Sequence, residues 1–472
     1  MDIETARQQY ITMKTVGTPA SEEALRLLVA ELMRQHRAGE APLPLEPPEI
    51  DDDAARPLLL GRIRMQATRA ARQTEYYAEV FSRIGLDPER LTWEDLARIP
   101  ITPKADMRDR AASFVATDTM PQYRSFTGGT TGGRPSGIWW SERELVLMTL
   151  SHTINAMAVP SVEFQFDLVL DIGDSTQFLS MMVGARIDSI WGDATMWGRM
   201  HDPDATVDQL METHRFGGQT SQPTATVAFA SYWGAVVEAA RRRGRRPGDF
   251  SLRMINACGE ITTSGLIRRS QDVFGNAPGM YHAWGSYGAT EIYGSGGGYP
   301  CPSGHMHFGN GLYAELLDPD TYAPAAPGGV ATLVATVLPP FRETTLLLRY
   351  DMEDLFQTLD AEPACGTPGT AVGMILGKRS LSVRHPDGRW TCPRHVLEAL
   401  EALDEVPLPA RCGFWASGDG VAVEVVVPGA AADVRRKVGD SLEQWGVPLR
   451  ELHIRDRRDD LARPYPLRCD GR

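Results

Sequence analysis

The stretch SFTGGTTGGRP, residues 125–135, carries the strongest indication of fold in the sequence. Four glycines and three threonines lie within residues 127–133, which we call the glycine loop. Glycine allows positive φ angles and close approach of the backbone to an anion. Successive backbone N–H groups can then surround an anion, and threonine hydroxyls add donors. The composition predicts a site for a triphosphate or pyrophosphate, or else a plain surface loop, and it lacks the Gly-Lys-Ser/Thr ending of a Walker motif.

Strand-like and helical patterns alternate along the chain. Helical periodicity predicts helices over residues 22–38 and 57–84, and the Pro-rich, acidic residues 41–53 between them predict a loop. Thr92 followed by an acidic residue near the third helical position has the form of a helix N-cap. The expected strands are Phe166 to Ile172, Met254 to Cys258, Ala331 to Val337 and Leu346 to Tyr350. This alternation predicts an α/β fold built from layers of helices and sheets.

The pattern changes near residue 377. The chain beyond it has expected helices at 393–403 and 431–445 and expected strands at 421–427 and 451–455. We therefore expect three parts. They are a helical N-terminal extension over residues 1–54, a large domain with mixed sheets and helices over residues 55–377, and a small mobile α+β domain over residues 378–472.

The charge and composition exclude several classes of protein. Acidic residues outnumber basic ones by 61 to 48, and the formal net charge is −13. Nucleic-acid binding depends on neutralising phosphates with basic residues, so we expect no nucleic-acid partner. The basic run Arg241–Arg246 is expected to be a solvated helix end. We find no apolar run of roughly 18 residues, no secretory N-terminal pattern and no disulfide-like cysteine spacing, so we expect a cytoplasmic protein that does not enter a membrane.

Four further motifs follow the glycine loop in order along the chain. They are ACGE at 257–260, YGATE at 287–291, RYDMEDL at 349–355 and GKRS at 377–380. Together with the loop, they resemble the motifs of the adenylate-forming superfamily, which includes acyl-CoA synthetases, luciferases and the adenylation domains of peptide synthetases. The family form of the loop is close to SSGTTGKP, and residues 129–132 keep its GTTG order.

Residues 61–110 narrow this resemblance. A helical stretch that ends in a tyrosine-rich segment is followed by GLDP at 85–88 and a short acidic helix. Pro100, Lys104, Asp106 and Arg108 then have approximately the spacing of a P-x-x-x-K-x-D-x-R element. This order is similar to the N-terminal segment of phenylacetate-CoA ligase-like enzymes, and the resemblance runs from about residue 55 to about residue 460.

The resemblance implies a role for most residues of these motifs. The phosphates of ATP would lie against Thr127, Gly128, Gly129, Thr130, Thr131 and Gly132. The adenine would lie against Gly259, Glu260, Tyr287 and Gly288. Thr290 would contact the α-phosphate, and Glu291 would hold Mg²⁺, a cation that prefers carboxylate and phosphate oxygens. Asp354 would accept hydrogen bonds from the ribose hydroxyls, and Lys378 and Arg379 would lie in the hinge between the large and small domains.

The C-terminal end departs from the family pattern. The family places a lysine near the C-terminus, where its charge stabilises the transition state of adenylation. No lysine follows Lys437 here, and Arg468 stands nearest the expected place. Either Arg468 replaces that lysine, or Lys378 assists, or adenylation is weak and the enzyme uses a smaller or different acid. Ser380 also replaces the usual hinge aspartate, so domain rotation is expected to differ from the family norm.

Aromatic residues near ACGE and YGATE predict a pocket for a flat aryl acid. The expected lining residues are Trp139, Tyr281, His282, Trp284, Gly285 and Ser286. Each of these residues would equally suit ordinary core packing.

A metal site is a further possibility that the spacing raises. Cys258, Cys301, His305 and His307 are spaced like metal ligands, and some phenylacetate-CoA ligase-like relatives carry a structural zinc in this region. Zinc would need a tetrahedron of such ligands. We expect no structural zinc here, but an ordinary buried cysteine with surface histidines.

The resemblance implies an AMP-producing ligase that uses ATP, Mg²⁺ and, for the second step, CoA. The expected substrate is a small aromatic acid, and the resemblance suggests a homodimer. One alternative is an adenylate-forming enzyme with another acid or acceptor. It would form an amide, or it would activate nitrite to diazotise an aryl amine. The other alternative is a catalytically silent nucleotide-binding protein.

Overall fold

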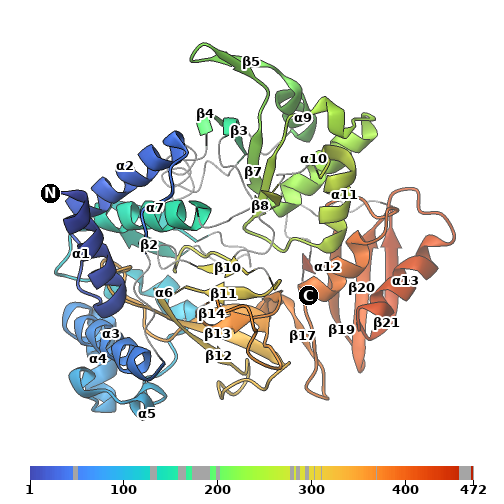
Figure 1. Cartoon of the computed structure of the whole chain (residues 1–472). Helices are drawn as coiled ribbons and strands as arrows, with labels where there is room; N and C mark the ends of the chain where they lie inside the picture. The colour runs from blue at the N-terminus through green and yellow to red at the C-terminus, as the bar shows by residue number, and fades with distance from the viewer. Residues whose placement is uncertain are drawn as a thin grey trace.

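The α/β fold expected from the sequence is confirmed. The structure, a computed structural model, describes residues 1–45, 52–127, 136–157, 166–172, 192–197, 202–276, 281–282, 287–292, 297–301, 303–309, 311–367, 369–456 and 469–470. Figure 1 shows the N-terminal helices on one side of the molecule and the C-terminal unit on the other, with the main sheets between them.

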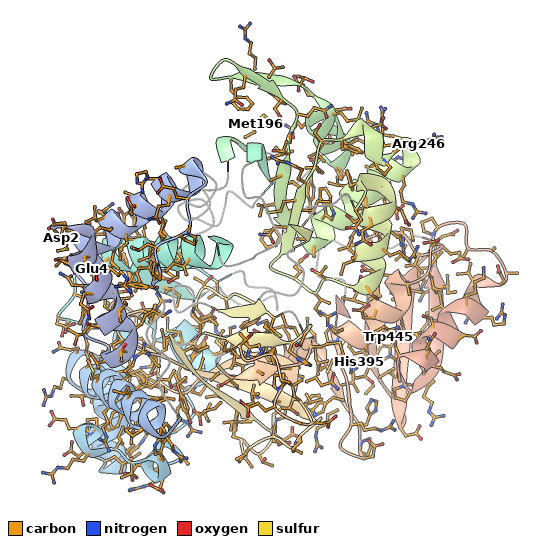
Figure 2. All side chains as sticks on the ribbon, viewed as in Figure 1. Asp2, Glu4, Met196, Arg246, His395 and Trp445 are labelled. Atoms are coloured by element: carbon orange, nitrogen blue, oxygen red, sulfur yellow. The ribbon has the colours of Figure 1, made fainter. Side chains whose placement is uncertain are left out.

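The N-terminal helices share one core with the rest of the large part of the chain. They are α1 (Ile3–Val16), α2 (Glu22–Ala38), α3 (Asp52–Gln73) and α4 (Glu75–Ile84), and α2 packs against α7 (Glu142–Met157). Asp2 caps α1 by accepting from the N–H of Thr5, and Glu4 lies in the first turn (Figure 2). A single helix over 57–84 was the wrong expectation, because Thr74 is extended and its hydroxyl caps a new helix at α4.

Short helical turns connect these helices to the first strands. They are η1 (Pro88–Arg90), α5 (Trp93–Leu96), α6 (Lys104–Asp109) and η2 (Ala111–Phe114). The capping box expected at Thr92 is present, because Thr92 and Asp95 each cap the other's backbone N–H. The strands β1 (Tyr123–Phe126) and β2 (Gly137–Trp140) then pair on either side of the glycine loop.

Within the described ranges, a five-stranded sheet has the order β4-β3-β7-β8-β9 with parallel neighbours. Its strands are β3 (Phe166–Ile172), β4 (Gly192–Trp197), β7 (Ala225–Phe229), β8 (Met254–Cys258) and β9 (Tyr281–His282). The expected strands at 166–172 and 254–258 are confirmed. Helices α9 (Pro203–Met211), α10 (Ala230–Arg242) and α11 (Ser264–Phe274) accompany this sheet, and β5 (His214–Phe216) pairs with β6 (Gln219–Ser221) as a hairpin.

A second, antiparallel sheet places the nucleotide motifs. It has the order β12-β13-β14-β16, with β12 (Leu312–Leu317), β13 (Val330–Val337), β14 (Tyr350–Gln357) and β16 (Ile375–Lys378). Beside it, β10 (Gly298–Pro300), β11 (Met306–Phe308) and β15 (Ala371–Val372) form a smaller sheet. The strand expected at 346–350 is wrong: β14 begins only at Tyr350, because Arg349 takes a positive φ of 44° that no regular strand accommodates.

The C-terminal unit is built on a third sheet. Its elements are β17 (Val383–Arg384), β18 (Trp390–Thr391), α12 (Pro393–Glu401), β19 (Cys412–Ser417), β20 (Gly420–Val426), α13 (Val434–Gln444), β21 (Leu449–Arg455) and β22 (Cys469–Asp470). The helices and strands expected after residue 377 agree with these elements to within a few residues. The sequence patterns missed β19 and β22.

Helix α11 of the large part contacts α12 of the C-terminal unit. Ser264 donates from its N–H and its hydroxyl to Glu398 at 2.9 and 2.5 Å. Arg269 is fully buried and donates to the carbonyls of Glu401, Leu403 and Val406 at 2.6–2.9 Å. The two units therefore share a hydrogen-bonded contact and not only a linker.

Two expectations drawn from composition concern membrane-spanning helices and the basic run at 241–246. In the described part of the chain, no helix is long and apolar enough to cross a membrane. The basic run at 241–246 ends α10 and is mostly exposed, as expected, and Arg246 lies at the edge of the molecule (Figure 2).

Gly265→Ala tests the contact between the two units. A Cβ at this helical position would lie 2.1 Å from the carbonyl oxygen of Glu401, so α11 and α12 would have to separate. Overpacking of this kind costs about 1–3 kcal/mol. We expect a lower Tm and faster limited proteolysis between the two units.

Gly61→Ala in α3 is the matched control. A Cβ there meets nothing within 4 Å, and alanine is favoured over glycine in a helix by about 0.5–1 kcal/mol. A Gly265→Ala variant as stable and as protease-resistant as Gly61→Ala would contradict the contact.

Candidate active site

Glu291 lies at the centre of a buried charged cluster. Its Oε1 is 3.2 Å from Nζ of Lys104, at the start of α6, and it accepts from the hydroxyl of Tyr350 at 3.3 Å. Only 3% of the Glu291 side chain is exposed. The carboxylate that the motif assigns to Mg²⁺ is thus withdrawn from water and faces a lysine.

Charge outweighs burial for both partners. Burial would raise the pKa of Glu291, but the ammonium groups of Lys104 and Lys378 hold this pKa below its usual value. Burial likewise would lower the pKa of Lys104, but Glu291 and Asp354 raise it instead. Lys104 and Glu291 are therefore both ionised at neutral pH.

Asp354 forms the second half of the cluster. It lies on β14 opposite Lys378 of β16, whose Nζ is 2.7 Å from its Oδ1. Its Oδ2 accepts from the hydroxyl of Tyr287 at 2.7 Å. Burial, together with the neighbouring charge of Asp354, raises the pKa of Tyr287 well above its usual value, so this tyrosine remains a hydrogen-bond donor. YGATE, RYDMEDL and GKRS, which are far apart in sequence, therefore meet at one place.

Both basic residues of this cluster are lysines, although most basic residues of the chain are arginines. Of the 48 basic residues in the chain, only Lys14, Lys104, Lys378 and Lys437 are lysines. Lys104 and Lys378 contact the two acidic residues of the nucleotide motifs. A lysine presents a compact charge with rotatable donors, whereas arginine presents a rigid fork. Two of the four lysines in the chain thus lie in this cluster, and every basic residue besides these four is an arginine.

The base of the glycine loop is closed by Thr127 and Ser136. The N–H of Thr127 donates to the carbonyl of Ser136 at 3.0 Å, and the N–H of Ser136 donates to the hydroxyl of Thr127 at 2.9 Å. The remaining expected phosphate-binding residues, Gly128, Gly129, Thr130, Thr131 and Gly132, lie outside the described residues.

Gly259 and Glu260 follow β8. Gly259 has a φ of 74°, and a Cβ there would lie 2.5 Å from the ring of Phe229. Glu260 accepts from the N–H of Ser231 at 2.9 Å and thereby lies at the N-terminus of α10. The ACGE motif has a local structural reason for its glycine and glutamate, besides any contact with adenine.

The structure places other expected site residues in contacts of their own or describes only their backbone. The guanidinium of Arg379 is bound by Asp351 at 2.7 Å and by the hydroxyl of Tyr322 at 3.1 Å. Trp139 faces Arg124 on one face of the β1–β2 pair, and Trp140 lies on the opposite face. The backbones of Tyr281 and His282 form β9, and Gly288 lies in the loop between Tyr287 and Thr290. Trp284, Gly285, Ser286 and Arg468 lie outside the described residues.

A separate group of metal-ligand side chains lies on β11 and the neighbouring loops. The ligand atoms of Cys301, His307 and Cys365 are within 4.8 Å of one another, and Nε2 of His307 is 3.2 Å from Sγ of Cys365. The expectation of surface histidines is wrong for His307, which is 4% exposed, whereas Cys301 is buried as expected. Cys365, distant in sequence, supplies a ligand that the spacing did not include.

Sequence reasoning missed the roles of Lys104 and Tyr350 at the cluster. Lys104 was noticed only through its spacing in the P-x-x-x-K-x-D-x-R element. Tyr350 was noticed only as the end of a strand and as a member of RYDMEDL, with no role assigned to it. The rarity of lysine was a usable indication for Lys104. Nothing in the sequence placed Tyr350 beside Glu291, since this contact depends on tertiary packing.

Comparison with known proteins finds sequence similarity over most of the chain. No protein-family model matches. Phenylacetate-coenzyme A ligase from Thermus thermophilus is 26% identical over 373 residues, covering 76% of this chain and 78% of that protein. Phenylacetate-coenzyme A ligase from Pseudomonas putida is 25% identical over 406 residues, covering 83% of this chain and 85% of that protein.

Solved structures share the fold. A 2-hydroxyisobutyryl-CoA ligase in its postadenylation state, in complex with 2-HIB-AMP, matches with a TM-score of 0.71 at 18% identity, over 90% of each chain. Together, these matches confirm that this chain resembles the adenylate-forming superfamily, and within it the phenylacetate-CoA ligase-like enzymes.

Proposed function

We propose that this protein activates a carboxylic acid with ATP and then transfers the acyl group to CoA, and that the preferred acid is aromatic. The observation that carries the proposal is the convergence of Glu291, Lys104, Asp354, Tyr287 and Lys378 in one buried cluster. The comparisons add that the relatives are CoA ligases.

In the first step, a carboxylate oxygen of the acid attacks the α-phosphorus of ATP. A bond forms between that oxygen and phosphorus, the bond to the β-phosphate breaks, and pyrophosphate leaves with its electron pair. Asp354 accepts from the ribose hydroxyls, and Thr290 contacts the α-phosphate. In the second step, the CoA thiol loses its proton to solvent, attacks the acyl carbon and displaces AMP.

The residues present fit a bound Mg²⁺. Glu291 is ionised and buried beside the position that the motifs assign to phosphate, and Mg²⁺ is commonly held by one or two carboxylates plus phosphate oxygens. Bound there, the cation would neutralise charge on the phosphates. Glu291 is the residue that would hold it.

Lys104 provides the positive charge that the C-terminal pattern lacks. It lies next to Glu291 and is charged, and its side chain retains 22% exposure. A fixed positive charge aimed at developing negative charge is an effective source of transition-state stabilisation. The function proposed here therefore does not require a lysine after Lys437.

The aromatic preference follows from the relatives. Two are named for phenylacetate, while the structural neighbour with the TM-score of 0.71 is named for 2-hydroxyisobutyrate, a non-aromatic acid. The two phenylacetate-CoA ligases are 26% and 25% identical to this chain, whereas the 2-hydroxyisobutyryl-CoA ligase is 18% identical. We therefore propose an aryl acid and test it against aliphatic ones.

The first experiment measures ATP-dependent pyrophosphate release with benzoic, aminobenzoic, phenylacetic, cinnamic and 2-hydroxyisobutyric acids, with and without CoA. We expect release with an aryl acid and acyl-CoA formation when CoA is present.

Glu291→Gln should lower kcat by about 10²-fold or more, because a charge-stabilising group is lost. Asp354→Asn should mainly raise KM for ATP.

Two outcomes would replace this function. Release only in a parallel reaction with nitrite and an aryl amine would indicate an enzyme that activates an inorganic acid. ATP binding without turnover in every reaction would indicate a silent nucleotide-binding protein.

A second experiment tests Lys104. Lys104→Ala should lower kcat for pyrophosphate release by about 10²-fold, the range seen when one charge-stabilising group is removed. Lys437→Ala is the control, because Lys437 is a surface lysine paired with Asp433 at 2.9 Å and should leave kcat unchanged. Equal activity of the two variants would remove Lys104 from the mechanism.

We further propose that Cys301, His307 and Cys365 hold a structural zinc ion, which revises the expectation from sequence. Two thiols and an imidazole are the donors that structural zinc sites use, and such sites take four ligands. Cys301 and His307 are buried, and Cys365 is partly exposed. The role of this site is to join β11 to the loop that carries Cys365, and no step of the reaction involves it.

Zinc content tests this site directly. Elemental analysis of the purified protein should find about one zinc per chain, the content of a single structural site. Cys365→Ser should lose most of it and lower the Tm. Cys412→Ala, which removes a buried cysteine of β19, is the control and should retain the metal. Zinc-free wild-type protein, or full zinc content in Cys365→Ser, would refute the site.

A further inference from the structure

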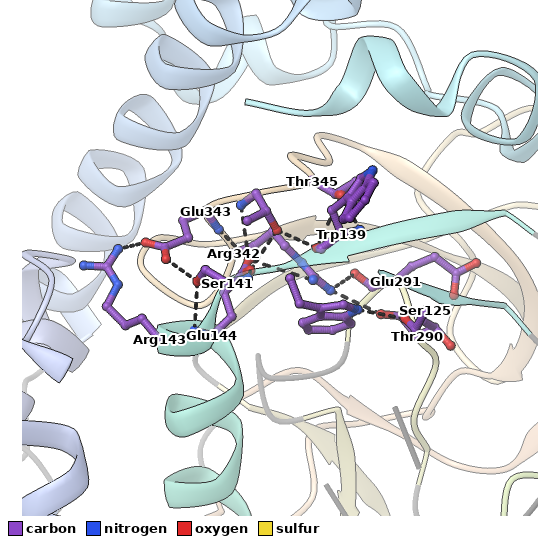
Figure 3. Close-up of polar contacts among 12 residues, drawn as sticks. Ser125, Trp139, Ser141, Arg143, Glu144, Thr290, Glu291, Arg342, Glu343 and Thr345 are labelled. Atoms are coloured by element: carbon purple, nitrogen blue, oxygen red, sulfur yellow. Dashed lines mark hydrogen bonds and ion pairs between the residues drawn. The ribbon is translucent and has the colours of Figure 1, made fainter. Parts of the chain in front are cut away.

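Arg342 is a fully buried arginine beside the YGATE motif. Its Nη2 donates to the carbonyls of Thr290 at 3.2 Å and Glu291 at 2.8 Å (Figure 3). Its guanidinium also lies 3.8 Å from the ring centroid of Trp140, in a cation–π contact. Burying a charge is costly unless it is well partnered. The partners of this charge include the backbone of two expected site residues.

The backbone at Thr290 and Glu291 needs such a partner. Both residues lie in a turn and belong to none of the described helices and strands. No sheet ladder therefore orients their peptide groups. One guanidinium nitrogen bonds both carbonyls and so fixes the direction in which both side chains leave the backbone.

Trp140 connects the same arginine to the glycine loop. The indole N–H of Trp140 donates to the hydroxyl of Ser125 at 2.8 Å. Ser125 lies on β1, two residues before Thr127, which closes the base of the loop with Ser136. The stack of Arg342 on Trp140 thus lies between the base of the phosphate loop and the YGATE turn.

Glu144 holds the segment that carries Arg342. Its Oε2 accepts from the N–H of Ser141 at 2.6 Å and the hydroxyl of Thr344 at 2.7 Å. Its Oε1 accepts from the N–H of Glu343 at 2.7 Å and lies 3.9 Å from Nη1 of Arg342. The start of α7 is therefore fastened to the two residues that follow the arginine, Glu343 and Thr344 (Figure 3).

We propose that Arg342 is a positioning residue that sets Thr290 and Glu291 against the base of the glycine loop. This inference rests on the function proposed above for those two elements. Arg342 itself touches no substrate, because it is buried behind Trp140 and the two carbonyls. It acts through the placement of the groups that bind the phosphates and Mg²⁺.

Arg342→Lys tests the proposal, because it keeps a positive charge but loses the planar fork and the stack on Trp140. We expect kcat for pyrophosphate release to fall by about 10²-fold, the loss seen when catalytic groups are misplaced by about 1 Å. We also expect the Mg²⁺ concentration for half-maximal activity to rise. Trp140→Phe, which keeps an aromatic ring under Arg342 but removes the bond to Ser125, should mainly raise KM for ATP.

Arg62→Lys is the matched control. Arg62 is also a buried arginine that donates to a carbonyl, that of Pro339 at 3.0 Å, and it lies near the ring of Phe341. Its replacement should lower the Tm about as much as Arg342→Lys but leave kcat and the Mg²⁺ dependence unchanged. A purely structural role for Arg342 predicts that the two variants behave alike.

The Mg²⁺ dependence of ATP binding, measured by titration calorimetry, separates the possible failures. An active wild type together with an Arg342→Lys variant of unchanged kcat and Mg²⁺ dependence overturns this inference alone. A wild type that binds ATP but releases no pyrophosphate overturns the proposed function. In that case, a weaker Mg²⁺-dependent affinity for ATP in Arg342→Lys than in Arg62→Lys still supports the positioning role, and equal affinities overturn it.

If Arg342→Lys does not fold, the Trp140→Phe variant is the test, and an unchanged KM for ATP in that variant overturns the proposal.

Discussion

Two carboxylates withdrawn from water, those of Glu291 and Asp354, impose the main constraint on this molecule. An ionised carboxylate inside a protein is tolerated when a cation and hydrogen-bond donors surround it. Lys104 and Lys378 supply the charge, and Tyr350 and Tyr287 supply the hydroxyl donors. These partners come from α6, β14, β16 and the YGATE turn. The packing of the two antiparallel sheets around β14 is therefore also the assembly of the site.

Arginines and lysines make different kinds of contact in this structure. Arginines lie where several backbone carbonyls must be bound, as Arg342 and Arg269 do. Lysines lie beside the two site carboxylates. An arginine fork suits several fixed acceptors, whereas a lysine can change partner with a small rotation of its side chain. The first kind of contact builds a framework, and the second can be exchanged for a contact with a ligand.

The sequence predicted the parts of the fold that depend on local patterns. The strands at 166–172 and 254–258 and the capping box at Thr92 needed only hydrophobic runs and a cap. The apolar run at 346–350 was misjudged, because burial in a loop and burial in a strand select the same residues. The motifs predicted Glu291, Asp354, Tyr287 and Lys378 as site residues, and the structure brings them together. The sequence could not reveal the roles of Lys104, Tyr350 or Arg342 in the same way, because no motif assigns them a role and their contacts depend on tertiary packing.

The pairing of Lys378 with Asp354 has a thermodynamic consequence for ligand binding. Both oxygens of Asp354 are already engaged, one by Lys378 and one by Tyr287. A ribose that bonds to this carboxylate competes with Lys378, which stands where β16 leads into the C-terminal unit. Linkage is reciprocal. If nucleotide binding releases Lys378 from Asp354, then holding Lys378 on Asp354 weakens the binding of the nucleotide by the same factor. Binding of the nucleotide and release of the segment that connects β16 to the C-terminal unit would then be coupled in a single equilibrium.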